Sequence, residues 1–265
     1  MSFFGSPFLY DGKQSEIYDL RLFEFSPSSP TNSPAGGDVS ISEQYLYRLP
    51  KPYFYGRYYQ SCLEFDFTVG SFNYIDGQTR HAIESWLLGR HTYLPLRIVQ
   101  DDIGDFIFNC IITQASQNYV GNLNYGLTLH AKCDSPWATQ VQPTLTKTYA
   151  DALMSETFTY LNSSAYDGYN RPSITFTMGS MATYFSIINA SDNNREFRFD
   201  TLTPLETITV DNERGIITSS ISGQLRISNF NKNFLRLVQG VNNLTLSGYI
   251  TNFTLDATFF KGIGA

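Results

Sequence analysis

The histidines are the residues of this chain best suited to acid–base or metal chemistry, and there are three, His81, His91 and His130. None of them stands at the spacing of a zinc or metalloprotease motif. The chain also lacks the Gly-x-Ser-x-Gly turn of serine hydrolases and a glycine-rich phosphate loop. We therefore predict no catalytic, cofactor-binding or metal-binding residues and no enzymatic activity. A β-sandwich hydrolase stays open as the least favoured alternative, because a catalytic triad can assemble from residues distant in sequence.

Acidic residues gather at two places, within Asp101–Asp105 and at Asp211 with Glu213. Neither group has the ligand offsets or the closing glutamate of a calcium-binding loop. We interpret both groups as turn residues.

The cysteines, Cys62, Cys110 and Cys133, are odd in number and widely spaced. This spacing indicates neither a zinc site nor a disulfide framework. Because Cys62 and Cys110 fall in apparent strands, we interpret them as small buried side chains.

The segment Tyr160–Pro172 has the residue types of a carbohydrate site, since it mixes aromatic rings, amides and an aspartate in an expected loop. Aromatic rings can pack on sugar faces while polar side chains bond the hydroxyl groups. The candidate glycan contacts are Tyr166, Tyr169 and Arg171. The alternative, which we favour, is an interdomain loop whose tyrosines pack against the following domain.

The composition of the 265-residue chain is typical of strands and turns, with 21 Phe, 18 Tyr and 15% aromatic residues in all. Charged residues make up only 16%, against about 25% in ordinary domains. This low charge favours a surface that partner subunits partly cover. The net charge of −6 and the absence of a basic patch argue against sequence-specific nucleic-acid binding. An acidic surface would instead suit a conduit through which DNA slides.

The chain shows no sign of export or membrane insertion. Its first residues lack the basic and apolar regions of a signal peptide, and no apolar run reaches about 18 residues. We therefore expect a soluble protein that is made in the cytoplasm and is not secreted.

The first half of the chain reads as strands with one helix. Apolar and polar residues alternate over 18–25 and 55–69, as in half-buried strands. Between these strands, residues 26–37 hold three prolines and two glycines, which predict a long exposed loop. That loop could be a lid in an enzyme or an arm in an oligomer.

The helix is predicted over residues 76–89. Asp76 is a suitable N-cap, and Gly89 is placed to end the helix in a left-handed conformation. Apolar residues at helical spacing between them form one stripe, namely Ala82, Ile83, Trp86 and Leu87.

Further strands follow the helix. They are predicted over 94–99, 106–113 and 125–133. Residues 118–122 lie between the last two strands, which is consistent with a hairpin or a protruding β-arm.

The second half reads as an antiparallel β-sandwich. Short strands with turn signals at roughly 8–12-residue spacing indicate this architecture. The predicted strands are 155–160, 173–178, 183–189, 195–199, 206–210, 215–219, 233–238, 243–250 and 252–260. The polar stretch from Gln140 to Thr148 places the domain boundary, which gives domains 1–139 and 140–265.

With these elements placed, the chain resembles the distal tail protein family of siphophages over nearly its whole length. The resemblance rests on the order and spacing of four features. They are Ile83–Leu87 followed by Leu94–Ile98, the aromatic-rich strand Phe106–Ile112, the strand and Pro-Trp-Ala turn of Leu127–Ala138, and the Gly-x-Asn loop and strand of Leu235–Gly248. The loop 26–37 and the aromatic stretch Tyr53–Tyr59 depart from the family pattern.

The resemblance implies a mainly β fold. The N-terminal domain would be a β-sandwich with one α-helix and a long β-hairpin, and it would form a homohexameric ring. The C-terminal domain would be an antiparallel β-sandwich like a galectin or a carbohydrate-binding module.

The resemblance also implies a structural role in the virion, at the distal end of the tail. The ring would be a baseplate hub that joins the tail tube protein to a tail-tip, tail-associated lysin-like protein and leaves a central channel for DNA. A side-fibre or receptor-binding protein would be a further partner. The alternative function is a glycan-binding host-recognition module of the tail tip.

Overall fold

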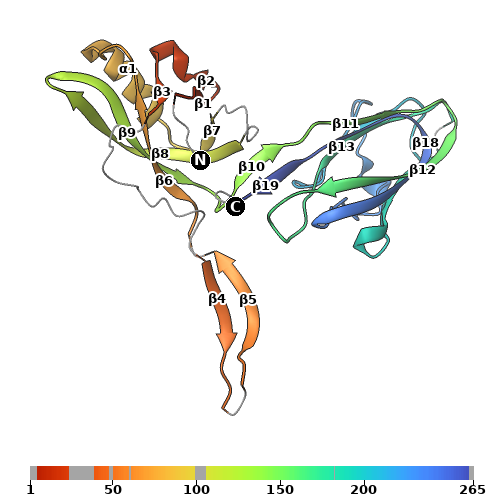
Figure 1. The fold of residues 1–265 in the computed structure, drawn as a ribbon. Coiled ribbons are helices and arrows are strands. Elements are labelled where there is room, and N and C mark those ends of the chain that lie inside the picture. Colours follow the sequence, from red (N-terminus) through yellow and green to blue (C-terminus); the bar gives the residue numbers. More distant parts are fainter. Residues whose placement is uncertain are drawn as a thin grey trace. The chain divides into compact units, whose positions relative to one another are not determined.

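The computed structural model describes residues 5–23, 39–47, 50–59, 61–98, 106–181 and 183–262. They fall into two units, an N-terminal unit that runs to Gln140 and includes the chain again from Lys261, and a C-terminal unit of Val141–Phe260. The predicted loop at 26–37 and the predicted turn at 101–105 lie outside the described residues. Each unit is built from antiparallel strands around its own apolar core (Figure 1), which confirms the mainly β fold class.

The N-terminal unit is built on one sheet with the strand order β2-β1-β7-β8-β9-β6-β3. Strand β10 adds to β8 through Thr139 and Ile107. The strands are β1 (Phe8–Tyr10), β2 (Lys13–Gln14), β3 (Arg21–Leu22), β6 (Glu64–Gly70), β7 (Leu94–Ile98), β8 (Phe106–Val120), β9 (Leu123–Cys133) and β10 (Ala138–Val141).

The start of the strand predicted at 18–25 is wrong, because Ser15–Tyr18 form a 3-10 helix and strand pairing begins only at Arg21. Asp19 ends this helix with a positive φ of 55°, and the chain turns there before it enters the sheet.

Helix α1 (Gly77–Leu88) lies over this sheet and confirms the predicted helix. Trp86 is its main contact. The indole ring stacks on Phe8 with 5.9 Å between ring centroids, and its Nε1 donates to the carbonyl oxygen of Tyr10 at 3.1 Å. The apolar stripe read from the sequence therefore faces the core, where Ile83 and Leu87 are also buried.

Both ends of α1 have the predicted residues, but only the N-terminus has the predicted geometry. Asp76 Oδ1 accepts from the amides of Gln78 and Thr79 at 2.8 and 2.9 Å. Gly89 is not left-handed, since its φ is −74°. A glycine is needed there for a different reason, because a Cβ would lie 2.5 Å from the Ser85 carbonyl oxygen.

The N-cap makes a pH-dependent prediction. Hydrogen bonds from Thr79 and Gln78 hold the pKa of Asp76 below its usual value. Its contribution to stability is therefore present above the unfolded pKa of about 3.9 and is lost as the pH falls through the lower folded value. Asp76→Ala should lower the melting temperature of the N-terminal unit at neutral pH, with the difference shrinking in acid. Thermal unfolding at several pH values measures this effect. Asp76→Asn, which keeps an N-cap acceptor, should retain most of the stability, and equal losses for both variants would contradict the capping role.

Strands β8 and β9 form the long hairpin that the resemblance implied. Their register runs from Cys110 opposite Cys133 to Val120 opposite Leu123, with irregularities near Thr113 and Asn118. Gly121, with a φ of 63°, makes the turn. Both strands extend further toward the turn than the sequence pattern predicted, because pairing continues where apolar alternation has ended.

A separate two-stranded sheet is formed by β4 (Val39–Gln44) and β5 (Tyr53–Tyr59). We call it the aromatic hairpin, together with the described residues 45–47 between its strands. It accounts for the aromatic stretch that departs from the family pattern.

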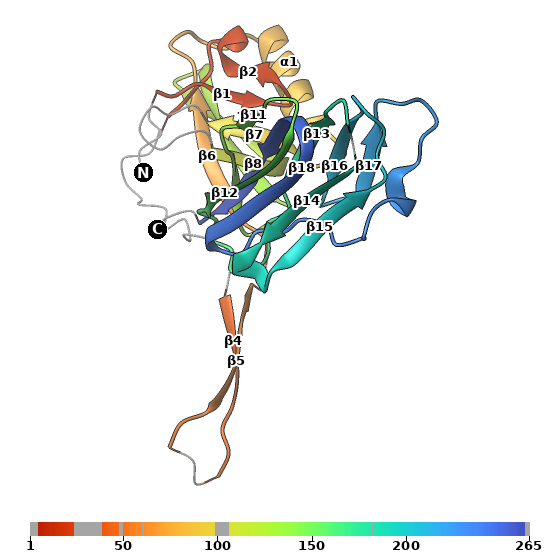
Figure 2. The same ribbon diagram turned by 90° about the vertical axis from the view of Figure 1, so that its right-hand side faces the viewer.

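The C-terminal unit is the predicted antiparallel sandwich (Figure 2). The strand order is β15-β14-β18-β13-β16-β17, and β11 and β12 also pair with β18. The strands are β11 (Leu145–Thr148), β12 (Leu153–Asn162), β13 (Ser173–Met178), β14 (Tyr184–Asn189), β15 (Arg195–Asp200), β16 (Thr207–Asp211), β17 (Ile216–Ser219) and β18 (Gly240–Asp256). The short strand β19 (Thr258–Lys261) follows β18 and belongs to the first sheet, where it pairs with β10.

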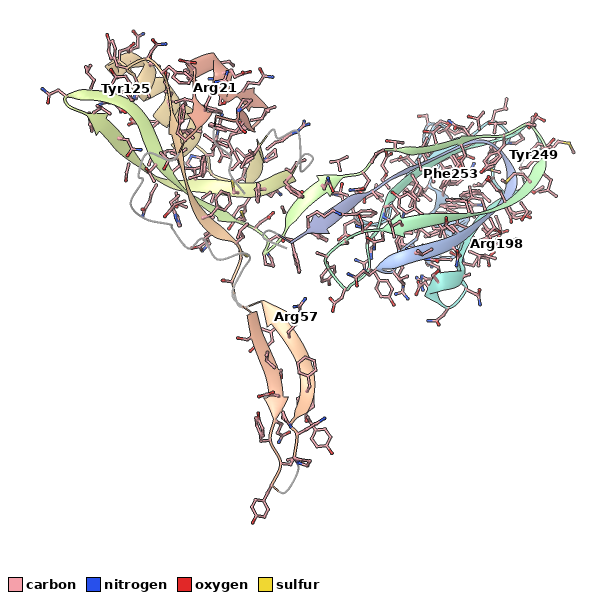
Figure 3. All side chains as sticks on the ribbon, in the orientation of Figure 1. Arg21, Arg57, Tyr125, Arg198, Tyr249 and Phe253 are labelled. Carbon is pink, nitrogen blue, oxygen red and sulfur yellow. The ribbon has the colours of Figure 1, made fainter. Side chains whose placement is uncertain are left out.

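Strand β18 corrects the prediction of separate strands at 243–250 and 252–260. It is continuous over 17 residues and belongs to both layers. Its first part lies between β12 and β14, and its second part lies between β11 and β13. Gly248, with a φ of 143°, lies where a Cβ would be 2.5 Å from the Tyr184 carbonyl oxygen, so the strand continues through a position that only glycine tolerates. Phe253 on its second part is fully buried in the core (Figure 3).

The strand predicted at 233–238 is also wrong. Only Leu237 there makes a bridge, with Asn170. The Leu235 amide donates instead to the side chain of the buried Asn212 at 2.8 Å, so a side chain takes the place of a neighbouring strand.

Candidate functional site

The aromatic hairpin carries large exposed apolar side chains on both of its faces. The register places Ile41 and Phe54 on one face and Tyr53 and Tyr58 on the other. Phe54 is 65% exposed and Ile41 62%. A two-stranded hairpin is marginally stable in water by itself, and exposed aromatic patches mark surfaces that bind partners.

The tip of the β8–β9 hairpin is a second exposed apolar surface. Tyr119, Val120 and Leu123 flank the turn and are all exposed. Its strands β8 and β9 have 15 and 11 residues, and Figure 1 shows the hairpin projecting from the sheet. Closer to the base of the hairpin, Gln117 bonds Glu84 of α1 at 3.0 Å, so the helix holds the hairpin in place below its tip.

The histidines do not form a catalytic group. His81 and His91 are exposed. His130 lies on β9 opposite Asp66 of β6, and its Nδ1 lies 2.6 Å from Asp66 Oδ1. Lys132 bonds Glu64 on the same face at 2.7 Å, and this bond holds the pKa of Glu64 below its usual value. Such exposed cross-strand pairs stabilise a sheet only weakly.

The cysteines are free thiols. Cys110 and Cys133 lie opposite each other on β8 and β9 and are fully buried. A hydrogen bond with Cys133, together with burial, raises the pKa of the Cys110 thiol, which opposes nucleophilic reactivity. Cys62 departs from the prediction, because it precedes β6 rather than lying in a strand and is only partly buried.

Of the candidate glycan contacts, Tyr166 packs edge-on against Phe260. The ring of Tyr169 lies under the Arg236 guanidinium, with 3.8 Å from Cζ to the ring centroid. Arg171 lines a hollow of about 400 Å³ that Arg236 also lines. Of the three candidates, only Arg171 therefore lines the hollow, while Tyr169 packs against Arg236 and Tyr166 against Phe260. A glycan contact by these three residues stays a prediction.

The same hollow includes residues that the sequence pattern did not single out, namely Arg195, Arg214, Phe234 and Arg236. They come from three separate segments of the C-terminal unit. No local motif links them, and only the fold brings them together.

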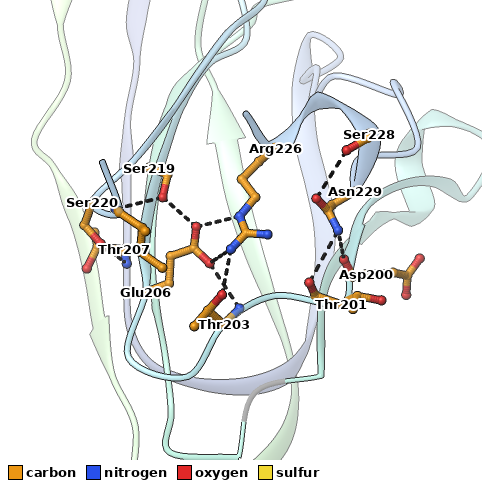
Figure 4. Close-up of polar contacts among 11 residues, drawn as sticks. Asp200, Thr201, Thr203, Glu206, Thr207, Ser219, Ser220, Arg226, Ser228 and Asn229 are labelled. Carbon is orange, nitrogen blue, oxygen red and sulfur yellow. Dashed lines mark hydrogen bonds and ion pairs between the residues drawn. The ribbon is translucent and has the colours of Figure 1, made fainter. Parts of the chain in front are cut away.

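A buried ion pair lies elsewhere in the C-terminal unit, between Glu206 and Arg226 (Figure 4). Two bonds of 2.7 Å join the guanidinium to the carboxylate. Ser219 donates to Glu206 at 2.6 Å, and Arg226 donates to Thr203 at 2.7 Å. Both carboxylate oxygens and two of the three guanidinium nitrogens therefore have partners, which is typical of a structural ion pair rather than of a reactive one.

Within the described residues, no three His, Cys, Asp or Glu side chains lie close enough to hold a metal ion. Asp211 has the predicted turn role, because its Oδ1 accepts from the amides of Glu213 and Arg214. No helix of the described chain is long and apolar enough to cross a bilayer.

Comparisons with known proteins agree with this architecture. The Dit protein of phage SPP1, described as a paradigm of the hub adsorption apparatus in phages that infect Gram-positive bacteria, superposes with a TM-score of 0.66 at 14% identity. The match covers 96% of this chain and 99% of that chain. A chain of the phage P2 baseplate, in its activated conformation with calcium, superposes with a TM-score of 0.55 at 8% identity over 96% of this chain and 97% of its own. At these identities the likeness shows a shared fold.

No curated protein matches the chain in sequence. Two family models do match, and in chain order. Residues 4–135 match the model of a phage tail protein N-terminal domain, and residues 144–255 match the model of a phage tail C-terminal domain. The chain therefore belongs to the phage tail protein family that these two models describe, as a structural component of the tail and not an enzyme.

Proposed function

We propose that the chain forms a homohexameric ring at the distal end of the tail, as a hub that joins the tail tube to the tail tip. The partners would be the tail tube protein on one side and a tail-associated lysin-like protein on the other, with a side-fibre or receptor-binding protein as a further partner. A central channel would let DNA pass. The solved structures that share this fold are a hub protein and a baseplate component, and the proposal extends their printed roles to this chain.

The observation that carries the proposal is the aromatic hairpin. Its exposed rings on two faces and its two edges, with which no other described strand pairs, are unfavourable in water and would be covered by a neighbouring subunit. A closed ring gives every copy such a neighbour, because each heterologous contact is repeated around the axis. The exposed tip of the β8–β9 hairpin offers a further contact.

Size-exclusion chromatography with light scattering tests the ring. The expected mass is six times that of the 30.0 kDa chain. Electron micrographs of tails labelled with an antibody to this protein should show it at the distal end. A strict monomer at high concentration, together with label elsewhere on the virion, would contradict the proposal.

We infer a second candidate function, host-glycan binding by the C-terminal unit. The observation that favours it is that Arg171 and Arg236 line one hollow and that the ring of Tyr169 packs against the Arg236 guanidinium. Binding to a glycan array that is lost in Tyr169→Ala would support it. Silence across surface and cell-wall glycans would leave only the structural role.

A further inference from the structure

The hollow in the C-terminal unit concentrates positive charge in an acidic protein. The chain has a net charge of −6, yet four of the eight residues that line this space of about 400 Å³ are arginines. They are Arg171, Arg195, Arg214 and Arg236. Guanidinium groups that converge on one cavity favour an anionic ligand, because each can donate two hydrogen bonds to a phosphate or carboxylate.

Two of these arginines have weak partners. Arg171 lies 3.6 Å from Glu213 and Arg214 lies 3.9 Å from Asp211, and all four side chains are at least 38% exposed. Solvent screens such pairs, so they contribute little to stability. Arg171 and Arg214 can therefore exchange a carboxylate of the protein for an anion of a ligand at small cost.

Arg195 has no carboxylate partner among the described residues. Its Nε donates to the carbonyl oxygen of Phe234 at 3.5 Å. That contact orients the guanidinium and leaves its two terminal nitrogens for a ligand. Arg195 is also only partly exposed, and a partly buried charge attracts an anion more strongly than a fully solvated one.

Arg236 is held rigidly by comparison. Its Nε and Nη2 donate to Asp192 at 2.6 and 3.0 Å, and Asp192 is almost fully buried. The ring of Tyr169 lies against its guanidinium. Asp192 neutralises this arginine, so Arg236 is a fixed part of the wall of the hollow, while the other three arginines supply the charge.

We propose that this hollow binds an acidic saccharide through its phosphate or carboxylate group. The arginines would hold the anion, and Phe234 offers an aromatic surface to a sugar ring. The volume fits a small ligand of this size class. The proposal rests on the second candidate function, host-glycan binding, and adds the ligand class and the residues; it does not depend on the ring.

The test is to titrate the full chain separately with glucose 6-phosphate, glucuronate, glucose and inorganic phosphate, and to measure binding by calorimetry or NMR. Glucose 6-phosphate or glucuronate should bind more tightly than glucose, and which acid binds better identifies the anion. Arg195→Gln should weaken this binding about tenfold, as expected for a lost charge-assisted hydrogen bond. Binding should also weaken as the salt concentration rises.

Arg198→Gln is the matched control. The substitution removes the same charge from the same strand, β15. Arg198, however, pairs with Glu196 and Asp200 and does not line the hollow. Figure 3 marks its place in the unit. Affinity that is unchanged in Arg198→Gln and reduced in Arg195→Gln supports the proposal.

The other outcomes contradict it in distinguishable ways. Equal losses in both variants would mean non-specific attraction to charge. Glucose that binds as well as the acids, with no effect of Arg195→Gln, would overturn the acidic ligand but leave glycan binding standing. Binding of inorganic phosphate with no binding of any sugar would overturn both the acidic ligand and glycan binding.

Discussion

Replacement of Arg226 by methionine is expected to destabilise the C-terminal unit by about 3–5 kcal/mol, the usual effect of removing one partner of a buried ion pair. The side chain of Glu206 is fully buried and that of Arg226 is 8% exposed. Methionine would fill much of the space but leave a buried carboxylate without its cation. Thermal unfolding of the full chain should show a loss on the order of 10–20 °C in the transition of this unit.

The pH dependence gives this prediction a second readout. Burial alone would raise the pKa of Glu206, but the bonds from Arg226, Ser219 and Thr203 outweigh it and hold the pKa below its usual value. In the native protein the contribution of Glu206 is present above the unfolded pKa of about 4.3 and is lost as the pH falls through the folded value. In Arg226→Met burial dominates and the pKa of Glu206 rises, so protonation relieves the variant. The stability difference between the two proteins should therefore narrow in acid.

Two further variants test the mechanism. Arg198→Met removes an arginine whose ion pairs are exposed to solvent, and its cost should stay below about 1 kcal/mol. Replacing both buried partners, as Glu206→Leu with Arg226→Met, should recover much of the stability, because no unpaired charge remains. A cost for Arg226→Met as small as that for Arg198→Met would show that water reaches the carboxylate.

Helix α1 could be predicted from the sequence because its signals are local. The cap at Asp76 and the apolar stripe that ends in Trp86 and Leu87 lie within one short segment. Most strands of the C-terminal unit were predictable for the same reason, since alternation along a strand reports its buried face.

What could not be predicted depends on contacts between distant segments. Strand β18 was predicted as two strands, because the strands that pair with it change near Gly248, where it passes from one layer to the other. Pairing with β14 ends at Gly248, and pairing with β13 begins at Ile250. The strand predicted over 55–69 is wrong in its extent, because β5 ends at Tyr59 and β6 begins at Glu64 in a different sheet. The aromatic residues on both faces of β5 gave no sign of that separation. Arg195 and Arg236 lie about 40 residues apart and share a hollow only through the fold. The succession of strands along the chain could therefore be predicted from the sequence, whereas the sites that these strands bring together could not.

The aromatic hairpin provides the second prediction with a large effect, the loss of the ring. The double variant Ile41→Thr with Phe54→Thr removes the apolar side chains of one face, and threonine keeps the β-propensity of the strands. Large side chains that act as hot spots at interface centres contribute roughly 2 kcal/mol or more each, and we expect this of both Ile41 and Phe54. The double variant should therefore weaken assembly by about a thousandfold and elute as a monomer at concentrations where the native chain forms the ring.

The folded monomer should be almost unaffected, because these side chains are largely exposed within the chain. Equal melting temperatures of the N-terminal unit in the native and variant chains would show this directly. Leu225→Thr is the control, since Leu225 is 80% exposed on the C-terminal unit and should leave the assembly intact.

The companion variant Tyr53→Thr with Tyr58→Thr removes the opposite face. If only one of the two double variants dissociates the ring, that face is the one a neighbouring subunit covers, and the other face is left for a tail partner. If both dissociate it, the hairpin is enclosed between subunits, as expected for a two-stranded element that is marginally stable alone. A ring that survives both double variants would mean that the β8–β9 tip or the sheet edges hold the subunits together, and the aromatic hairpin would then have to bind something other than a second copy of this chain.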